Sequence, residues 1–320
     1  MKMTNHPAEV LRLGTRGSAL ALWQAHWVKG ELERQWPGLH VELITIKTTG
    51  DKILNVPLAD VGGKGLFTKE IDDALLAGRI DIAVHSMKDI PFMLPNGIEF
   101  GAIPEREDPR DAFISNGRML GDLPPAAVIG TSSLRRQVQL RHSFPSIKLI
   151  PLRGNVDTRL KKVAAGEFDG IVLALAGLKR LGQEARVTQI LDQNLMLSAV
   201  GQGALGIACR TGDSVARARL APLDHCSTRL AVTAERGLLA VLEGSCKVPI
   251  AGHAEYQSGT ITMRGLVANL AGTVVVEERI SGNADSDSTA RELGIKLGKQ
   301  LVERGAGDIL AEISQRGASR

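Results

Sequence analysis

The sequence has few aromatic residues and few cysteines. Aromatic side chains make up 3% of the 320 residues, so binding of single-stranded nucleic acid by base stacking is not expected. The three cysteines, Cys209, Cys226 and Cys246, are too few and too uneven in number for a disulfide framework. They indicate reduced thiols in a cytoplasmic protein, and they leave one thiol available for chemistry.

Long apolar runs and metal-binding patterns are also missing. No stretch approaches the roughly 20 apolar residues that span a bilayer, and the polar residues 1–10 do not resemble a signal peptide. Neither Cys-x-x-Cys nor His-Glu-x-x-His occurs, so no metal site is expected. With 39 basic and 35 acidic residues the net charge is only +4. Basic residues can therefore matter only where they cluster.

The chain is long enough for two or three domains, and its first two thirds alternates strand-like and helix-like patterns. This rhythm indicates parallel or mixed sheets covered by helices. The predicted strands are 10–15, 40–47, 80–86, 128–130, 148–152 and 170–174, and the predicted helices are 18–36, 66–77, 133–142 and 156–165. In the last hundred residues, helices at 226–242 and 288–304 flank strands at 251–256, 260–269 and 273–280. That order predicts a smaller α+β domain with an antiparallel sheet.

A weak internal repetition runs through the α/β region. Gly14-Thr15 and Gly130-Thr131 each lead from a strand into a helix, and 77–84 matches 165–172 at Ala, Gly, Asp and Val. Chance and two similarly built domains explain this about equally well. Two such domains would direct both helix N termini, which attract anions, into the cleft between them.

Two segments are predicted to cross between these domains, namely the charged residues 105–110 and the glycine-rich residues 197–206. Gly201–Gly206 also fits the G-x-G-x-x-G pattern of dinucleotide sites. A strand-like run follows it instead of the required helix, so we reject that site.

Three basic turns follow predicted strands. Residues 130–136 combine the hydroxyls of a helix start, Ser133 among them, with Arg135 and Arg136. Residues 153–159 place Arg153 and Arg159 around a second turn, and residues 16–18 repeat the pattern with Arg16 and Ser18. Each turn alone could be a capped helix with surface arginines. Three at strand ends, where open α/β sheets bind ligands, predict a site for an anionic substrate.

Three further residues are candidates for chemistry. Asp89 follows Lys88 after a buried strand, and beside that cation it can stay ionised and move protons. A turn-capping role is an equally good explanation of this motif alone. Lys64 lies in a glycine-rich loop before a helix, as a carboxylate-binding arm or a solvated lysine would. Cys246 lies in a turn beside Lys247, which could favour the thiolate, although an inert buried thiol is the simpler interpretation.

Taken together, these motifs resemble the porphobilinogen deaminase (hydroxymethylbilane synthase) family over essentially the whole chain. The matching segments are 15–18, 62–67, 85–89, 105–113, 130–136, 152–155, 176–180, 200–203 and 246–249. The resemblance implies two α/β domains like those of periplasmic binding proteins plus a third, smaller α+β domain. The domains would comprise 1–104 with 200–221, then 105–199, then 222–320, which carries the cofactor cysteine.

The resemblance also implies a transferase. It would condense four porphobilinogen molecules onto a dipyrromethane primer joined by a thioether to Cys246, release ammonia at each step, and then hydrolyse off hydroxymethylbilane. Asp89 would be catalytic. The residues implied to hold the cofactor are Cys246, Lys88, Asp89, Ser133, Arg135 and Arg136, and those implied to hold substrate are Arg16, Ser18, Lys64, Arg153, Arg159, Arg180 and Gln202.

Two other functions compete with this one. A two-domain anion-binding module explains the basic turns but neither Asp89 nor a cysteine on a third domain. A nucleotide-handling enzyme is disfavoured by the missing phosphate loop. We expect a monomer whose only partner is the small-molecule substrate porphobilinogen, with neither nucleic acid nor membrane involved.

Overall fold

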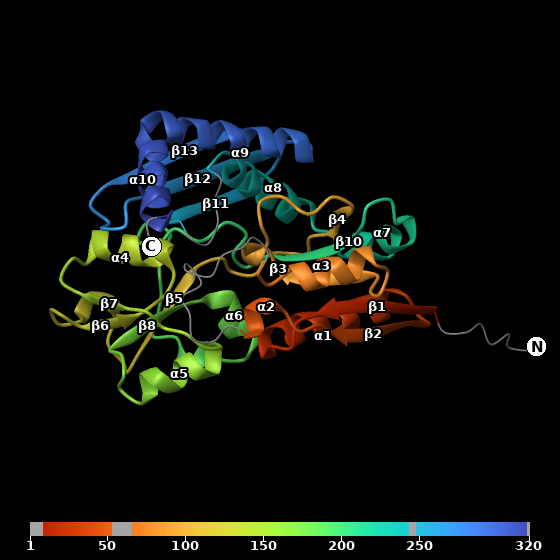
Figure 1. The fold of residues 1–320 in the computed structure, drawn as a ribbon, viewed down its shortest axis with the longest axis horizontal. Helices are drawn as coiled ribbons and strands as arrows, with labels where there is room; N and C mark the ends of the chain where they lie inside the picture. The colour runs from red at the N-terminus through yellow and green to blue at the C-terminus, as the bar shows by residue number, and fades with distance from the viewer. Residues whose placement is uncertain (1–8, 53–65, 243–247, 319–320) are drawn as a thin grey trace, which may run out of the picture.

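The computed structural model describes residues 9–52, 66–242 and 248–318. These residues form two five-stranded sheets and one three-stranded sheet. In Figure 1 the first sheet lies at the right, the second at the lower left, and the third above them.

The first sheet has the strand order β2-β1-β3-β10-β4. β1 pairs in parallel with β2 and β3, whereas β10 runs antiparallel to β3 and β4. The strands are β1 (Glu9–Thr15), β2 (Leu39–Thr45), β3 (Ile82–Ser86), β4 (Ile98–Ala102) and β10 (Leu205–Arg210), and the helices are α1 (Ala19–Gln35), α2 (Thr49–Lys52), α3 (Lys69–Leu76) and α7 (Ser214–Leu220). The chain therefore returns to this sheet, through β10, after the second sheet is complete.

The second sheet repeats this plan with the order β7-β6-β8-β5-β9. β6 pairs in parallel with β7 and β8, and β5 runs antiparallel to β8 and β9. The strands are β5 (Asp111–Ser115), β6 (Val128–Gly130), β7 (Lys148–Ile150), β8 (Gly170–Ala174) and β9 (Gln189–Ile190), and the helices are α4 (Leu134–Ser143), α5 (Val156–Ala164) and α6 (Leu175–Arg180). The shared topology favours two similarly built domains as the cause of the internal repetition.

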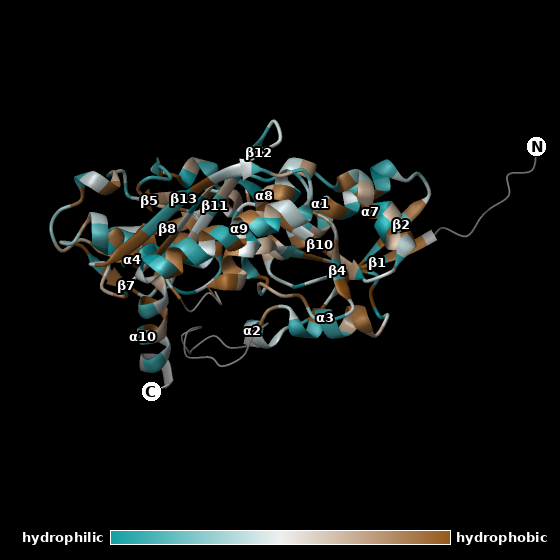
Figure 2. Ribbon diagram, turned by 90° about the horizontal axis from the view of Figure 1, so that it is seen from above, coloured by the Kyte–Doolittle hydropathy of each residue, from teal (hydrophilic) through white to brown (hydrophobic). Residues whose placement is uncertain are grey.

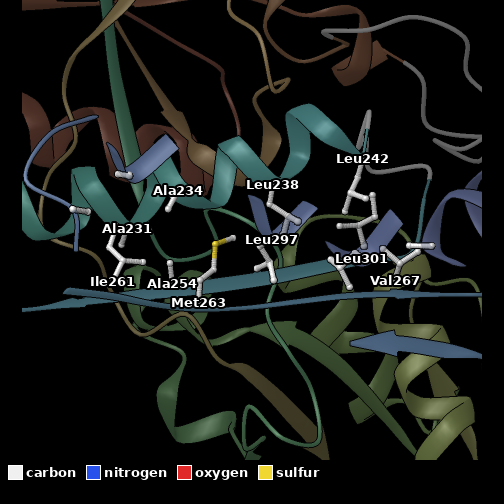
Figure 3. Packing of buried hydrophobic residues seen from close by; sticks show 14 of the residues in the cluster. Ala231, Ala234, Leu238, Leu242, Ala254, Ile261, Met263, Val267, Leu297 and Leu301 are labelled. Atoms are coloured by element: carbon white, nitrogen blue, oxygen red, sulfur yellow. The ribbon is translucent and has the colours of Figure 1, made fainter. Parts of the chain in front are cut away.

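The third sheet is antiparallel, in the order β11-β12-β13. It comprises β11 (Ile250–Gln257), β12 (Thr260–Ala268) and β13 (Val275–Asn283), with α8 (Cys226–Val241), α9 (Asp287–Leu301), a turn that bends at Gly305 (Val302–Ala306) and α10 (Gly307–Ala318). Figure 3 shows leucines of α8 and α9 meeting Met263 and Val267 of β12. The two helices approach closely at Gly294, where a Cβ would lie 1.8 Å from the carbonyl oxygen of Ala234. Only glycine permits this packing.

The predicted fold class is confirmed, since two mixed α/β sheets and an antiparallel α+β unit are present. Figure 2 shows hydrophobic strands covered by helices with hydrophilic outer faces. Among the described residues, no helix combines the length and the apolar character that crossing a membrane requires.

The sequence did not predict β4, β5, α6, α7 or α10. β5 begins at Asp111, a charged residue that is fully buried. Sequence patterns treat such a residue as part of a loop, because only tertiary partners make its burial possible.

Candidate active site

The basic turns lie at the carboxyl ends of neighbouring parallel strands. Gly14 of β1 pairs with Ala83 of β3, so the turns that follow β1 and β3 lie close together. Gly130 of β6 pairs in the same way with Ile171 of β8. Each five-stranded sheet therefore presents its candidate residues at one edge, where open α/β sheets bind ligands.

Arg16 follows β1 and is held by two neighbours. Its Nε donates to Oδ1 of Asp51 at 3.1 Å, its Nη2 also donates to Asp51, and the guanidinium lies 4.3 Å from the centre of the Phe67 ring. Burial, followed by the positive charge of Arg16, lowers the pKa of His85 to about 4. His85 is therefore neutral near pH 7 and does not compete for anions.

Ser18 caps helix α1, because its hydroxyl accepts the backbone N–H of Ala21 at 3.3 Å. The hydroxyl hydrogen remains available as a donor. The predicted ligand contact of Ser18 is thus compatible with its capping role.

Lys88 and Asp89 lie in a short 3₁₀ turn (Met87–Asp89) that directly follows β3. Both are exposed, and neither has a hydrogen-bond or ion-pair partner within the described ranges. The surrounding protein, and to a smaller extent the charges of Arg136 and Arg135, lower the pKa of Lys88 to about 8, although Asp89 opposes this shift. Water therefore reaches the Lys88 side chain, although many protein atoms lie around it. Lys88, which follows β3 of the first sheet, is also within electrostatic reach of Arg135 and Arg136 in α4 of the second domain.

Helix α4 begins at Ser133, which is its N-cap residue but makes no side-chain capping bond. Ser133 is thus at the helix start, as predicted, but its hydroxyl makes no capping bond. Thr131 instead accepts the Ser133 N–H at 3.2 Å. The Ser133 hydroxyl and the first N–H groups of α4 remain available to an anion.

Arg135 and Arg136 are both buried against Asp111, the first residue of β5. Nη1 of Arg135 lies 2.7 Å from one carboxylate oxygen of Asp111, and Nη2 of Arg136 lies 2.7 Å from the other. Arg135 also donates to the carbonyl oxygen of Leu197, and Arg136 to that of Val172. Asp111 is 0% exposed, and the two arginines hold its pKa well below the ordinary value, against the effect of burial. The triad keeps a net charge of +1.

Arg153 and Arg159 bracket the turn before α5. Arg159 donates from Nε to the carbonyl oxygen of Gly154 at 2.7 Å, whereas Arg153 has no partner in the part of the chain that the structure describes. Burial, followed by the charges of Arg136 and Arg153, lowers the pKa of Arg159 to about 10. Arg159 is therefore close enough to Arg136 and Arg153 to be repelled by both, which is compatible with a site for an anion.

Arg180 and Gln202 lie where the two crossing segments meet. Arg180, at the end of α6, donates to the carbonyl oxygen of Gly203 at 2.6 Å, and burial lowers its pKa to about 10. Gln202 is 1% exposed and donates to Asp111 and to the carbonyl oxygen of Pro109. Gln202 is thus buried within the Asp111 cluster.

The predicted site residues therefore differ in whether their side chains are available to bind a ligand. Lys88, Asp89, Ser133 and Arg153 have side-chain groups without partners in the described chain, whereas Arg135, Arg136 and Gln202 are committed to Asp111. The sequence assigned no role to Asp111 or Asp51. Asp111 lies in the matching segment 105–113, which could have drawn attention to it.

Lys64 and Cys246 lie outside the described residues. The described residues contain no group of His, Cys, Asp and Glu side chains that could hold a metal ion.

Taken together, the fold and the site define a multidomain α/β protein with basic side chains at the strand ends and, beside one of them, an aspartate that no described residue pairs, which suits a substrate with several carboxylates. The family model for the porphobilinogen deaminase dipyrromethane cofactor binding domain matches residues 11–218, and that for the porphobilinogen deaminase C-terminal domain matches residues 229–303.

Similar proteins agree with these models. The chain is 53% identical to a porphobilinogen deaminase from Geobacter sulfurreducens, over 97% of this chain and 96% of that protein. It is also 53% identical to one from Syntrophobacter fumaroxidans, over 95% and 98%. Among solved structures, the probable amino-acid ABC transporter binding protein ytmK from Bacillus subtilis covers 68% of this chain and 90% of its own chain, at 9% identity. Its TM-score is 0.41, so we draw no conclusion from this similarity.

The chain belongs to the porphobilinogen deaminase family. It is a transferase that condenses porphobilinogen in tetrapyrrole biosynthesis, and it contains the family's dipyrromethane cofactor binding domain.

Proposed function

We propose that the chain adds four porphobilinogen molecules, one at a time, to a dipyrromethane primer on Cys246, releases ammonia at each addition, and then hydrolyses off hydroxymethylbilane. The observation that carries this proposal is the turn after β3, which exposes Lys88 and Asp89 side by side without side-chain partners among the described residues, within electrostatic reach of the arginines of α4. The rival function, an anion-binding module without chemistry, gives no reason for such a carboxylate among cations that bind carboxylates.

The residues present suit a primer with acetate and propionate groups on each ring. Donors without partners among the described residues include the ammonium group of Lys88, the hydroxyl of Ser133 and the guanidinium of Arg153. The repulsion of Arg159 by Arg136 and Arg153 indicates positive charge that no described carboxylate fully neutralises. Each charge-assisted hydrogen bond contributes about 1.5–3 kcal/mol, so several together can retain a growing anionic chain. The primer, when bound, supplies the ring carbon to which the first substrate is joined.

Asp89 acts on the substrate in this proposal. Its carboxylate accepts hydrogen bonds from pyrrole N–H groups and stabilises the positive charge that develops as ammonia leaves. It then accepts or relays the proton that is lost when the ring regains aromaticity.

The other arginines bind substrate carboxylates as the chain grows. We assign this role to Arg16, Arg153, Arg159 and Arg180, with Ser18 and Lys64. Arg135, Arg136 and Gln202 act together with Asp111, whose contacts fix α4 so that Ser133 at its N terminus would bind a carboxylate of the primer.

Intact mass tests the attachment. The purified protein is expected to carry the added mass of two pyrrole rings, and Cys246→Ala is expected to lack it. Cys226→Ala is the matched control, because Cys226 is exposed and could react. Cys209 is buried and its pKa is raised to about 11, chiefly by burial, so it is a poor nucleophile. An active protein without the adduct, or an adduct that persists in Cys246→Ala, would refute the attachment.

Asp89→Ala is expected to fold normally and to lose at least 99% of turnover, a barrier increase of about 2.7 kcal/mol. Asp89 is exposed and makes no side-chain bond to a described residue that the substitution would break. Turnover of porphobilinogen and thermal unfolding should be measured together. Retention of more than about a tenth of wild-type turnover, a change below ~1.4 kcal/mol, would remove Asp89 from catalysis.

We also propose three domains, comprising 1–104 with 200–221, then 105–199, then 222–320. This division is supported by the position of β10 within the first sheet and by the second sheet, which is formed entirely from residues between Asp111 and Ile190. A monomeric, cytoplasmic enzyme remains part of the proposal, and size-exclusion chromatography with light scattering would test the oligomeric state.

A further inference from the structure

We infer that Asp51, with Phe67, is a positioning residue that holds Arg16 so that one edge of its guanidinium stays free for a substrate carboxylate. The inference rests on the proposed substrate-binding role of Arg16. It assigns no contact with substrate to Asp51 itself.

The geometry of the ion pair carries the argument. A guanidinium has two edges that can bind a carboxylate through two N–H groups, one formed by Nε and Nη2 and the other by Nη1 and Nη2. Asp51 occupies the first edge, since Nε and Nη2 of Arg16 both donate to it. Nη1 has no partner among the described residues, so the second edge remains available.

Other contacts restrain both members of the pair. The Phe67 ring covers one face of the guanidinium, with its centre 4.3 Å away. Asp51 is fixed in turn by Thr48, whose hydroxyl and backbone N–H donate to Oδ2 at 2.7 and 3.2 Å. Arg16 is thus restrained at an edge and at a face.

The position of Arg16 gives this restraint a purpose. Arg16 follows β1, the strand that pairs with β3, and β3 leads directly to Lys88 and Asp89. The side chains of Arg16 and Asp51 are 23% and 28% exposed, so a ligand can reach the pair. Arginine loses considerable rotamer freedom on binding, and a restraint that exists beforehand reduces that cost.

The opposite role for Asp51 is conceivable from the same contacts. A carboxylate bound to Arg16 could compete with the carboxylate of the substrate and weaken binding. The second edge, which no described residue occupies, favours positioning, because the substrate need not displace Asp51. The two roles predict opposite changes in KM.

The test compares Asp51→Ala, Arg16→Ala and the double variant. Under positioning, Asp51→Ala raises KM for porphobilinogen about tenfold with little change in kcat, the order of effect expected when one arginine loses its preorganisation. Asp51→Glu restores part of the affinity. The double variant has the KM of Arg16→Ala, since Asp51 acts only through Arg16.

A matched control is available on the third sheet. Glu277 accepts from Nε and Nη2 of Arg264 at 3.2 and 2.8 Å, and the side chains are 32% and 17% exposed. Glu277→Ala removes an ion pair at the same guanidinium edge and of similar exposure, on strands that carry none of the predicted site residues, and should leave KM unchanged. Intact mass confirms that every variant carries the primer.

Each other outcome overturns the inference in a distinguishable way. A lower KM in Asp51→Ala would show that Asp51 competes with substrate. An unchanged KM, or an equal increase in the wild-type and Arg16→Ala backgrounds, would show that Asp51 does not act through Arg16. An unchanged KM in Arg16→Ala would remove Arg16 itself from the proposed substrate site, and the inference with it.

Discussion

The two five-stranded sheets are alike down to individual side chains. Asp81 precedes β3 and accepts the backbone N–H of Arg12, from β1, at 2.9 Å. Asp169 precedes β8 and accepts the backbone N–H of Val128, from β6, at 2.7 Å. The glycines Gly78 and Gly166, three residues before these aspartates, have φ of +67° and +75°. The same aspartate hydrogen bond and the same glycine turn thus precede a central strand in both sheets.

The sheets differ in how they hold the arginines at their strand ends. In the first sheet, Arg16 pairs with Asp51, and both side chains are about a quarter exposed. In the second, Arg135 and Arg136 share Asp111, whose side chain is 0% exposed. A buried anion between two arginines holds them more firmly than a partly exposed ion pair does. The comparison indicates that the arginines of α4 are held more firmly than Arg16, which is restrained by contacts that solvent can reach.

The largest expected effect that tests this difference follows removal of the buried carboxylate. Asp111→Ala should lower the free energy of unfolding by about 3–5 kcal/mol, because two buried arginines lose their counter-charge. Asp51→Ala should cost less than ~1 kcal/mol, as accessible ion pairs contribute little. Urea unfolding of both variants measures the contrast. Equal losses would show that the two sheets hold their arginines equally firmly.

The second-largest expected effect is a loss of folding stability at acidic pH. The pKa of Asp111 and that of Asp51 are both lowered in the folded protein by their arginine partners. Each carboxylate therefore stabilises the fold fully above its unfolded-state pKa of about 3.9 and progressively less as the pH falls toward its folded-state pKa.

Unfolding free energies measured between about pH 5 and pH 2.5 should show this loss. Asp111→Asn should flatten the pH dependence more than Asp51→Asn. A residual slope is expected from Glu235, whose pKa is lowered to about 2 by Arg106 and His253 against the effect of burial. Equal slopes in the two variants would contradict the assigned difference between the sheets.

The smallest expected effect, on substitution of equivalent glycines, tests the similarity of the two five-stranded sheets. Gly78→Ala and Gly166→Ala should each cost about 1–2 kcal/mol, because alanine is strained at positive φ. A Cβ added at either glycine would have no atom within 4 Å, so steric clashes add nothing. Gly30→Ala, in helix α1, is the control with the opposite sign, since it is equally open and alanine favours the helix by up to ~1 kcal/mol. Clearly unequal losses at Gly78 and Gly166 would show that the two turns are not equivalent.

Much of the fold could be predicted from patterns within short segments. The predicted helix at 226–242 corresponds to α8 (Cys226–Val241), and the predicted strand at 170–174 to β8 (Gly170–Ala174). Local patterns were sufficient there because α8 packs an apolar face on the third sheet and β8 is a short apolar run buried on both faces. They failed at β5, since the burial of Asp111 depends on Arg135 and Arg136, which lie more than twenty residues away.

The candidate site residues were also predicted only in part from the sequence. The sequence alone located the basic turns and Asp89, because glycine turns, helix-capping residues and arginines after strands are local signals, and the family motifs contain them. Only the tertiary structure separated Lys88, Asp89, Ser133 and Arg153, which have no partner among the described residues, from arginines already bound to Asp111 or Asp51. The physical reason is that an ion pair depends on distances between side chains from different elements, and local sequence does not encode those distances.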